Sequence, residues 1–272
     1  MKKILFFISD STGLTIETLG NSLLTQFNYM DAERITLPYI NTVEKAHQAA
    51  QTIQWYCKND CKNVLIFSSL VDPEIRKIIR NTKAIMLDSF ETFLPQLEQA
   101  LQEKHKKNIG LSHAVKDENT YASRIEAINF ALLTDDGGGT KHYDQAEIIL
   151  TGISRSGKTP TCLYLALQFG VLAANYPITE EDLHTYTLPK PLQPYQSKLF
   201  GLTIQEDRLQ EIRAQRRPDS RYASSKQCQV ECQQAEDLFK QHYITYLNTT
   251  RFSIEEIATH IIHQRGMKRK RF

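Results

Sequence analysis

Long apolar runs and a strong charge bias are both missing from this sequence. No apolar run approaches the roughly 20 residues of a membrane-spanning helix, so we expect no membrane association. The formal net charge of +2 gives no electrostatic reason to expect nucleic-acid binding. The opening apolar run stops at Ser9-Asp10, too early for a secretory signal, which favours a buried strand in a cytoplasmic protein.

Cysteine is scarce and lacks the spacing of common metal sites. Five cysteines are an odd number, and without a secretory signal they are expected to be free thiols. Cys57/Cys61 and Cys228/Cys232 are each spaced i,i+4, which places each pair on one helix face. A zinc site made of these four is the alternative, although C-x2-C is the usual spacing.

Basic residues gather at the C-terminus, which reads RGMKRKRF. This tail is either a solvated chain end or a docking segment for an acidic partner.

The first hundred residues alternate between strand and helix patterns. The expected strands are 4–8, 34–40, 64–67 and 84–87, and the expected helices are 14–27, 44–57, 72–80 and 90–103. Repeated strand–helix units predict an α/β fold with a parallel, doubly wound sheet. Residues 1–108 are therefore expected to form a Rossmann-like N-terminal lobe.

The rhythm stops near Lys104 and restarts after a bridging segment, residues 109–145. This segment holds a predicted helix, 121–133, and the acidic, glycine-rich TDDGGGTKHYD, expected to be a mobile loop. Residues 146–272 are predicted to form a P-loop kinase-like α/β lobe that ends in the basic tail. Its expected strands are 148–150, 171–174 and 199–204. One helix is expected to end at about 169, and three further helices are expected over 207–216, 231–247 and 253–264.

The second lobe begins with a complete phosphate-binding motif. GISRSGKT matches G-x-x-x-x-G-K-[ST] and lies between an apolar strand and a helix, the context that this motif requires. Backbone amides and the helix dipole would bind phosphate oxygens, Lys158 would add a charge, and the Thr159 hydroxyl would bind Mg²⁺. The predicted nucleotide-binding residues are Gly152, Ile153, Ser154, Arg155, Ser156, Gly157, Lys158 and Thr159.

Charged residues around this motif are candidates for the chemistry. Arg155 either stabilises a transferring phosphate or points to solvent. No later strand ends in the Asp that usually supports the metal, so Asp135 and Asp136 are candidates for that role. Asp135 is predicted to bind Mg²⁺, and one of the pair to accept the proton of an attacking hydroxyl, unless both belong only to a turn. No GTPase base-recognition signal such as NKxD is present.

A second candidate site is the turn after the first strand. Asp10, Ser11, Thr12 and Gly13 open a helix at a point where α/β sheets bind ligands, so they suit a phosphate or the target, with a helix cap as the alternative. His113 is a candidate base or phosphate contact, and Arg124 has a similar status.

Four stretches resemble the phosphoenolpyruvate synthase regulatory proteins and their relatives, the pyruvate, phosphate dikinase regulatory proteins. They are ISDSTGLTIETLGNSLLTQF, YASRIEAINFALLTDDGG, GISRSGKTPTCLYLALQFGVLAANYP and KLFGLTI, which occur in the family's order over nearly the whole chain. LGNSLLTQF and LPYINTVEKA are more similar to the synthase branch.

The resemblance implies a bifunctional enzyme that inactivates and reactivates phosphoenolpyruvate synthase. Its kinase reaction would use ADP to phosphorylate a target threonine, and its phosphorylase reaction would use inorganic phosphate to remove that group as pyrophosphate. By resemblance, residues 152–159 bind ADP, with Lys158 central, and Asp135 and Asp136 match the family's acidic pair. The alternatives are the same chemistry on pyruvate, phosphate dikinase, an ATP-dependent small-molecule kinase, and a non-catalytic nucleotide sensor. A homodimer is left open.

Overall fold

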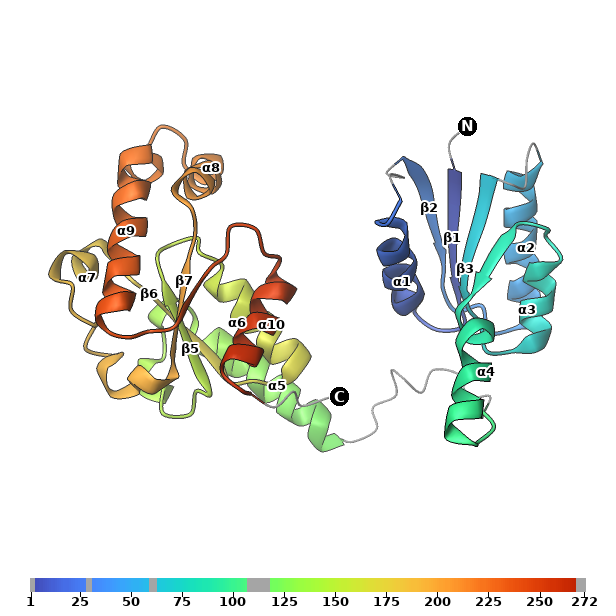
Figure 1. Cartoon of the computed structure of the whole chain (residues 1–272), viewed down its shortest axis with the longest axis horizontal. Helices are drawn as coiled ribbons and strands as arrows, with labels where there is room; N and C mark the ends of the chain where they lie inside the picture. Colours follow the sequence, from blue (N-terminus) through green and yellow to red (C-terminus); the bar gives the residue numbers. More distant parts are fainter. Residues whose placement is uncertain (1–2, 28–30, 59–62, 107–117, 268–272) are drawn as a thin grey trace. The chain divides into compact units, whose positions relative to one another are not determined.

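The computed structural model describes residues 3–27, 31–58, 63–106 and 118–267. The chain divides into two compact units, Met1–Ala114 and Val115–Phe272. Each unit contains a four-stranded parallel sheet with helices packed on it (Figure 1), which confirms the predicted α/β class. No helix in these ranges is long and apolar enough to cross a membrane.

The first unit alternates strands and helices from its first described residue. Its strands are β1 (Lys3–Ser9), β2 (Ala32–Leu37), β3 (Val64–Ser69) and β4 (Ile85–Asp88), and its helices are α1 (Leu14–Leu24), α2 (Val43–Cys57), α3 (Pro73–Arg80) and α4 (Ser89–Leu101). The strand order is β2-β1-β3-β4, with every pair parallel. The chain reverses its direction of travel across the sheet after β2, so α1 covers one face, and α2 and α3 cover the other (Figure 1).

Alternating side chains of β1 supply two cores in this unit. Phe6 and Ile8 face Ala46 and Ile53 of α2, whereas Leu5 and Phe7 belong to the core under α1. A strand buried on both faces must be apolar throughout, which explains the ILFFI run. The predicted cap of α3 is confirmed, because Asp72 accepts a hydrogen bond from the Glu74 amide and Pro73 is the first helical residue.

The second unit repeats the topology of the first without an evident sequence repeat. Its strands are β5 (Ile148–Gly152), β6 (Ala173–Pro177), β7 (Leu199–Thr203) and β8 (Tyr246–Asn248), paired in the parallel order β6-β5-β7-β8. Its helices are α5 (Glu118–Leu133), α6 (Lys158–Phe169), α7 (Glu180–Thr185), α8 (Glu206–Arg216), α9 (Ser225–Gln241) and α10 (Ile254–Gln264). Its short 3₁₀ turns are η2 (Asp135–Gly137), η3 (Thr140–His142), η4 (Gln193–Lys198) and η5 (Arg221–Ala223).

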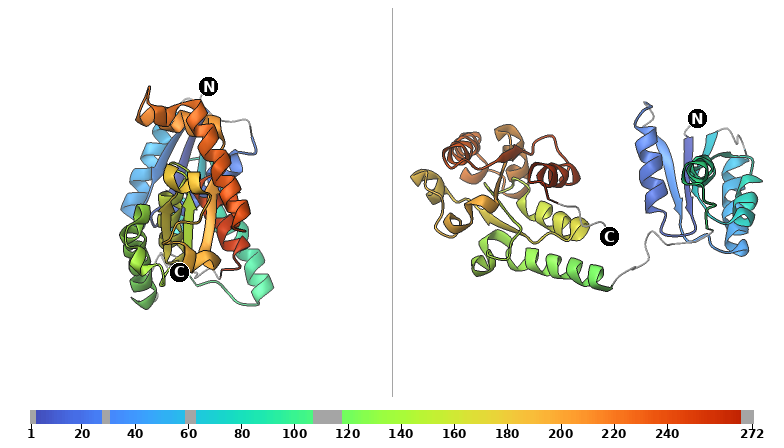
Figure 2. Two further views of the ribbon diagram at one scale, coloured as in Figure 1. Left: turned by 90° about the vertical axis from the view of Figure 1, so that its left-hand side faces the viewer. Right: turned by 60° about the horizontal axis from the view of Figure 1, so that its bottom comes forward.

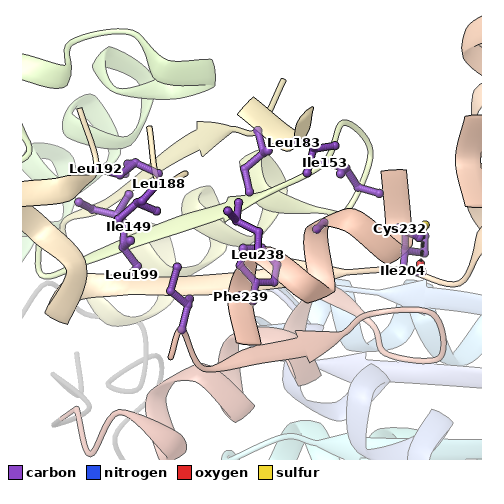
Figure 3. Packing of buried hydrophobic residues seen from close by; sticks show 14 of the residues in the cluster. Ile149, Ile153, Leu183, Leu188, Leu192, Leu199, Ile204, Cys232, Leu238 and Phe239 are labelled. Atoms are coloured by element: carbon purple, nitrogen blue, oxygen red, sulfur yellow. Dashed lines mark hydrogen bonds between the residues drawn. The ribbon is translucent and has the colours of Figure 1, made fainter. Parts of the chain in front are cut away.

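Helices pack on both faces of the second sheet (Figures 1 and 2). The core that includes α5, α6 and α10 contains Leu150 and Phe200 from the strands. On the other face, Ile149 and Leu199 lie beside Leu238 and Phe239 of α9 (Figure 3). The two faces of the sheet thus hold separate apolar cores. Ligands of such sheets bind at the loops that follow the carboxyl ends of the strands.

The predicted helix over 231–247 is wrong at both ends. Ser224 caps α9 through the Gln227 amide, and Tyr243 takes a left-handed φ of +54° just after the helix ends. The following residues form β8, which pairs with β7. The Tyr, Ile, Thr and Leu residues of this segment are compatible with a helix or a strand. They form a strand because the free edge of β7 is available to pair with them. The last helix begins as predicted, with a Ser253–Glu256 capping box.

Candidate functional site

The phosphate-binding motif forms the turn between β5 and α6. Gly152 ends the strand so close to β7 that a Cβ there would lie 2.3 Å from the Leu202 carbonyl oxygen. Gly157 precedes the helix at φ +94°, a conformation that disfavours side chains. The strand–turn–helix context that the motif requires is therefore present, and both glycines are required by the backbone.

A cavity of about 660 Å³ opens over this turn. Its lining combines residues from the motif, from the acidic turn η2, from the end of β6 and from the end of α8. They are Asp135, Asp136, Ser154, Arg155, Gly157, Lys158, Thr159, Pro160, Pro177 and Arg216. The structure thus brings the predicted acids together with the predicted phosphate-binding residues, although they lie about twenty positions apart in the sequence.

Lys158 is the most deeply buried cation of this cavity. Its side chain is 5% exposed, and its ammonium donates one hydrogen bond to the Ile153 carbonyl, at 2.9 Å. Burial lowers the pKa of Lys158 to about 8, against the opposing effect of the Asp136 and Asp135 carboxylates. An ammonium has three donors, so it can also bind phosphate oxygens in the cavity.

The acidic turn is held in place by hydrogen bonds. One Asp135 carboxylate oxygen accepts from the Thr159 hydroxyl at 2.7 Å and from the Asn175 amide at 2.6 Å. The Asp136 backbone amide donates to the Asn175 side-chain oxygen at 3.0 Å. The predicted mobile loop is therefore ordered in this part, because Asn175 of β6 is wholly buried and fixes both acids.

The two acids differ in what their side chains do. Asp135 pairs with the Thr159 hydroxyl, and a loop hydroxyl with an Asp is the oxygen set that holds Mg²⁺ in phosphate-loop enzymes, so this pair fits that ion. The Asp136 carboxylate lines the cavity and accepts no hydrogen bond from another of the described residues. Within the same ranges, no group of three or more His, Cys, Asp or Glu side chains is arranged to hold a metal.

A buried arginine donates a hydrogen bond to the backbone of the motif. It is not among the site residues predicted from the sequence. Arg213 of α8 is fully buried and donates to the Ser154 carbonyl at 3.2 Å, the Tyr222 carbonyl at 3.1 Å and Glu231 at 2.6 Å. Its guanidinium stacks on the Tyr222 ring, whose hydroxyl contacts the Ser154 hydroxyl at 2.9 Å. The pattern RLQEIRAQRR indicates a basic helix, but it does not say which arginine points inward.

The predicted second site lies in the first unit. Gly13 caps α1 with φ +82° and no side-chain cap bond, so the helix-cap alternative is not what Asp10 does. The Asp10 carboxylate instead accepts from the Val71 amide at 2.8 Å, and burial raises its pKa. The Ser11 amide donates to Ser9, and within the described residues the buried Thr12 hydroxyl has no hydrogen-bond partner. Phosphate or target binding at this turn stays a prediction.

The remaining sequence candidates are distributed over other parts of the chain. His113 lies outside the described residues, as do the last five residues of the basic tail, and Arg124 lies on α5. Arg265 is part of the fold, because its guanidinium donates to the Leu199 carbonyl and lies over the Phe200 ring. The four described cysteines are buried free thiols, namely Cys57, Cys162, Cys228 and Cys232.

A family model described as kinase/pyrophosphorylase matches residues 5–262. A protein of Legionella pneumophila strain Corby is 49% identical over 270 residues, covering 99% of this chain and 100% of its own. One from Marinobacter nauticus is 51% identical over 271 residues, covering 100% of both chains, and one from Pseudomonas aeruginosa strain LESB58 is 48% identical over 270 residues, covering 99% and 98%.

All three relatives are named, provisionally, as phosphoenolpyruvate synthase regulatory proteins. The family match spans both units, including the phosphate-binding motif, the acidic turn and Asn175. This chain therefore belongs to the kinase/pyrophosphorylase family.

Proposed function

We propose that this protein regulates phosphoenolpyruvate synthase by reversible phosphorylation of a threonine, with ADP as the phosphoryl donor. The observation that carries the chemistry is the cavity in which Lys158 of the phosphate-binding turn and the acids Asp135 and Asp136 meet. The choice of target is supported by the names of relatives about 50% identical over their full length. The choice of ADP rests on the family resemblance, since the turn recognises phosphates and not their number.

In the kinase reaction, the threonine hydroxyl attacks the β-phosphorus of ADP. A new phosphorus–oxygen bond forms to threonine, the bond to the bridging oxygen breaks, and AMP leaves. The motif amides and Lys158 would stabilise the phosphate oxygens, and Asp136 would accept the hydroxyl proton because its carboxylate faces the cavity. Thr159 and Asp135 would hold Mg²⁺, which would neutralise charge on the phosphates when bound.

The phosphorylase reaction uses the same groups with a different acceptor. Inorganic phosphate attacks the phosphorus of phosphothreonine, pyrophosphate forms, and the threonine oxygen leaves. Asp136 would accept the proton of the attacking hydrogen phosphate and deliver a proton to this oxygen. Positioning and charge stabilisation serve both directions, so one cavity is sufficient for both reactions.

A labelling experiment with purified phosphoenolpyruvate synthase tests the proposal. β-labelled ADP is expected to label a synthase threonine, whereas γ-labelled ATP is not. Lys158→Ala should abolish the transfer, and Asp136→Asn should slow it by roughly 100- to 10,000-fold. Lys190→Ala, an exposed lysine outside the cavity in the same unit, is the matched control and should retain wild-type activity.

The outcomes separate the alternatives. Label transferred from ATP and not from ADP would contradict the donor assignment. Transfer to pyruvate, phosphate dikinase and not to the synthase would contradict the target. ADP binding without phosphoryl transfer to either protein would support the alternative of a non-catalytic nucleotide sensor.

A further inference from the structure

Two arginines that line the cavity form no ion pair with a carboxylate of the described residues. Arg155 lies in the middle of the motif with a left-handed φ of +75°, and Arg216 is the last residue of α8. No hydrogen bond or ion pair described for residues 118–267 involves either guanidinium. Both residues are exposed, in contrast to the buried Lys158. The cavity therefore carries positive charge beyond the lysine of the motif.

The position of Arg216 is coupled to the motif through the arginine one turn before it. Arg213 is fully buried and donates to the carbonyl of Ser154, the residue that immediately precedes Arg155. Glu231 of α9 and the Tyr222 ring fix the same guanidinium. The hydrogen bond from Arg213 to Ser154 thus connects the last turn of α8, which holds Arg216, with the motif, which holds Arg155.

The chemistry of the proposed function requires a second anion site. The motif amides, the helix dipole and Lys158 serve the phosphates of the nucleotide. After transfer in the kinase reaction the phosphothreonine product carries a phosphate, and in the phosphorylase reaction phosphothreonine and free inorganic phosphate are both present. Guanidinium groups bind phosphate oxygens through paired hydrogen bonds, which suits a group that must be held in one orientation.

We propose that Arg155 and Arg216 together form an anion subsite for the phosphate that is not part of the nucleotide. This inference rests on the proposed function and adds Arg216, in the last turn of α8, to the site. The shared chemistry is a phosphate dianion, carried by phosphothreonine or by inorganic phosphate. The competing interpretation is an arginine that only stabilises the end of its helix, as cations do at that position.

Binding measurements on the full chain distinguish these interpretations. Phosphothreonine and, separately, inorganic phosphate are titrated by calorimetry into protein saturated with AMP and Mg²⁺. ADP is titrated into the same proteins without AMP. The variants are Arg216→Ala, Arg216→Lys and Arg155→Ala, and the matched control is Arg217→Ala, the adjacent arginine, which does not line the cavity. Far-UV circular dichroism verifies that each variant is folded.

Arg216→Ala is expected to weaken binding of the phosphate probe by roughly 10- to 100-fold, the value of a charge-assisted hydrogen bond, and to leave ADP affinity within about threefold. Arg155→Ala should weaken the same probe, Arg216→Lys should have an intermediate effect, and Arg217→Ala should have none. Weakening of one probe alone supports the subsite and identifies which phosphate it holds, and weakening of both assigns it to the shared dianion.

Three results would overturn the subsite. These are an equal loss of ADP affinity in Arg216→Ala, an equal effect of Arg217→Ala, and no binding of either probe to the AMP-saturated wild type. Failure of the proposed function would look different, because it would be seen as no transfer from ADP in the labelling experiment.

Discussion

Asn175 offers the sharpest test of how the acidic turn is held. Its side chain is wholly buried, donates to Asp135 at 2.6 Å and accepts from the Asp136 amide at 3.0 Å. Asn175→Ala removes both bonds and leaves the Asp136 amide without this acceptor. A bond to a charged group contributes roughly 1.5–3 kcal/mol and a neutral one about 1 kcal/mol, so the expected loss of stability is about 2–4 kcal/mol.

Hydrogen exchange followed by mass spectrometry measures this loss where it occurs. Amides of β5 and β6 should exchange roughly 30- to 1000-fold faster in Asn175→Ala, which is the expected loss converted to an opening equilibrium. Amides of β1 and β3 belong to the other sheet and provide an internal reference. Thr151→Val is the matched control, because this buried hydroxyl of β5 has no hydrogen-bond partner among the described residues and its removal should cost little.

Asn175→Asp tests the charge of the same contact. It places a second carboxylate oxygen where the amide nitrogen lies, 2.6 Å from Asp135, and two carboxylates this close cannot both ionise. The pKa of one must rise, so the variant is least stable above that raised pKa and recovers as the pH falls below it. Exchange in β6, corrected for intrinsic rates, should therefore be closer to wild type at pH 5 than at pH 8. Unchanged protection in Asn175→Ala, or an equal loss in Thr151→Val, would refute the reasoning.

Three further predictions concern buried groups of the second unit. Because burial lowers the pKa of Lys158 to about 8, ADP affinity measured by calorimetry should fall by up to about tenfold per pH unit above that value, and Lys158→Met should not show this fall. Arg213→Met leaves Glu231 without its buried partner and should destabilise the unit by roughly 3–5 kcal/mol in urea, whereas adding Glu231→Gln should recover part of the loss; an unchanged midpoint in Arg213→Met would contradict the bracing role. Burial raises the pKa of Cys162, and that of Cys232 to about 12, so neither thiol of the native protein should react with Ellman's reagent at pH 8 until urea is added.

The sequence by itself determined the α/β class, the position of the phosphate-binding turn and the caps at Asp72 and Ser253. These features depend on residues that are close together in the chain. Examples are a continuous apolar run followed by a turn, and a side chain that accepts a hydrogen bond from an amide two or three residues later. The motif is local for the same reason, since its glycines and Lys158 act within one turn.

Tertiary structure decided which groups surround that turn. Asn175 is one polar residue in the middle of a short strand, and only the pairing of β6 with β5 places it against Asp135 and Asp136. Likewise, α8 contains several arginines, and only the packing of α8 against α9 selects Arg213 as the buried one and leaves Arg216 facing the cavity. Contacts between residues dozens of positions apart leave no period or spacing in the sequence, so the local pattern predicted the motif and the folded chain supplied its partners.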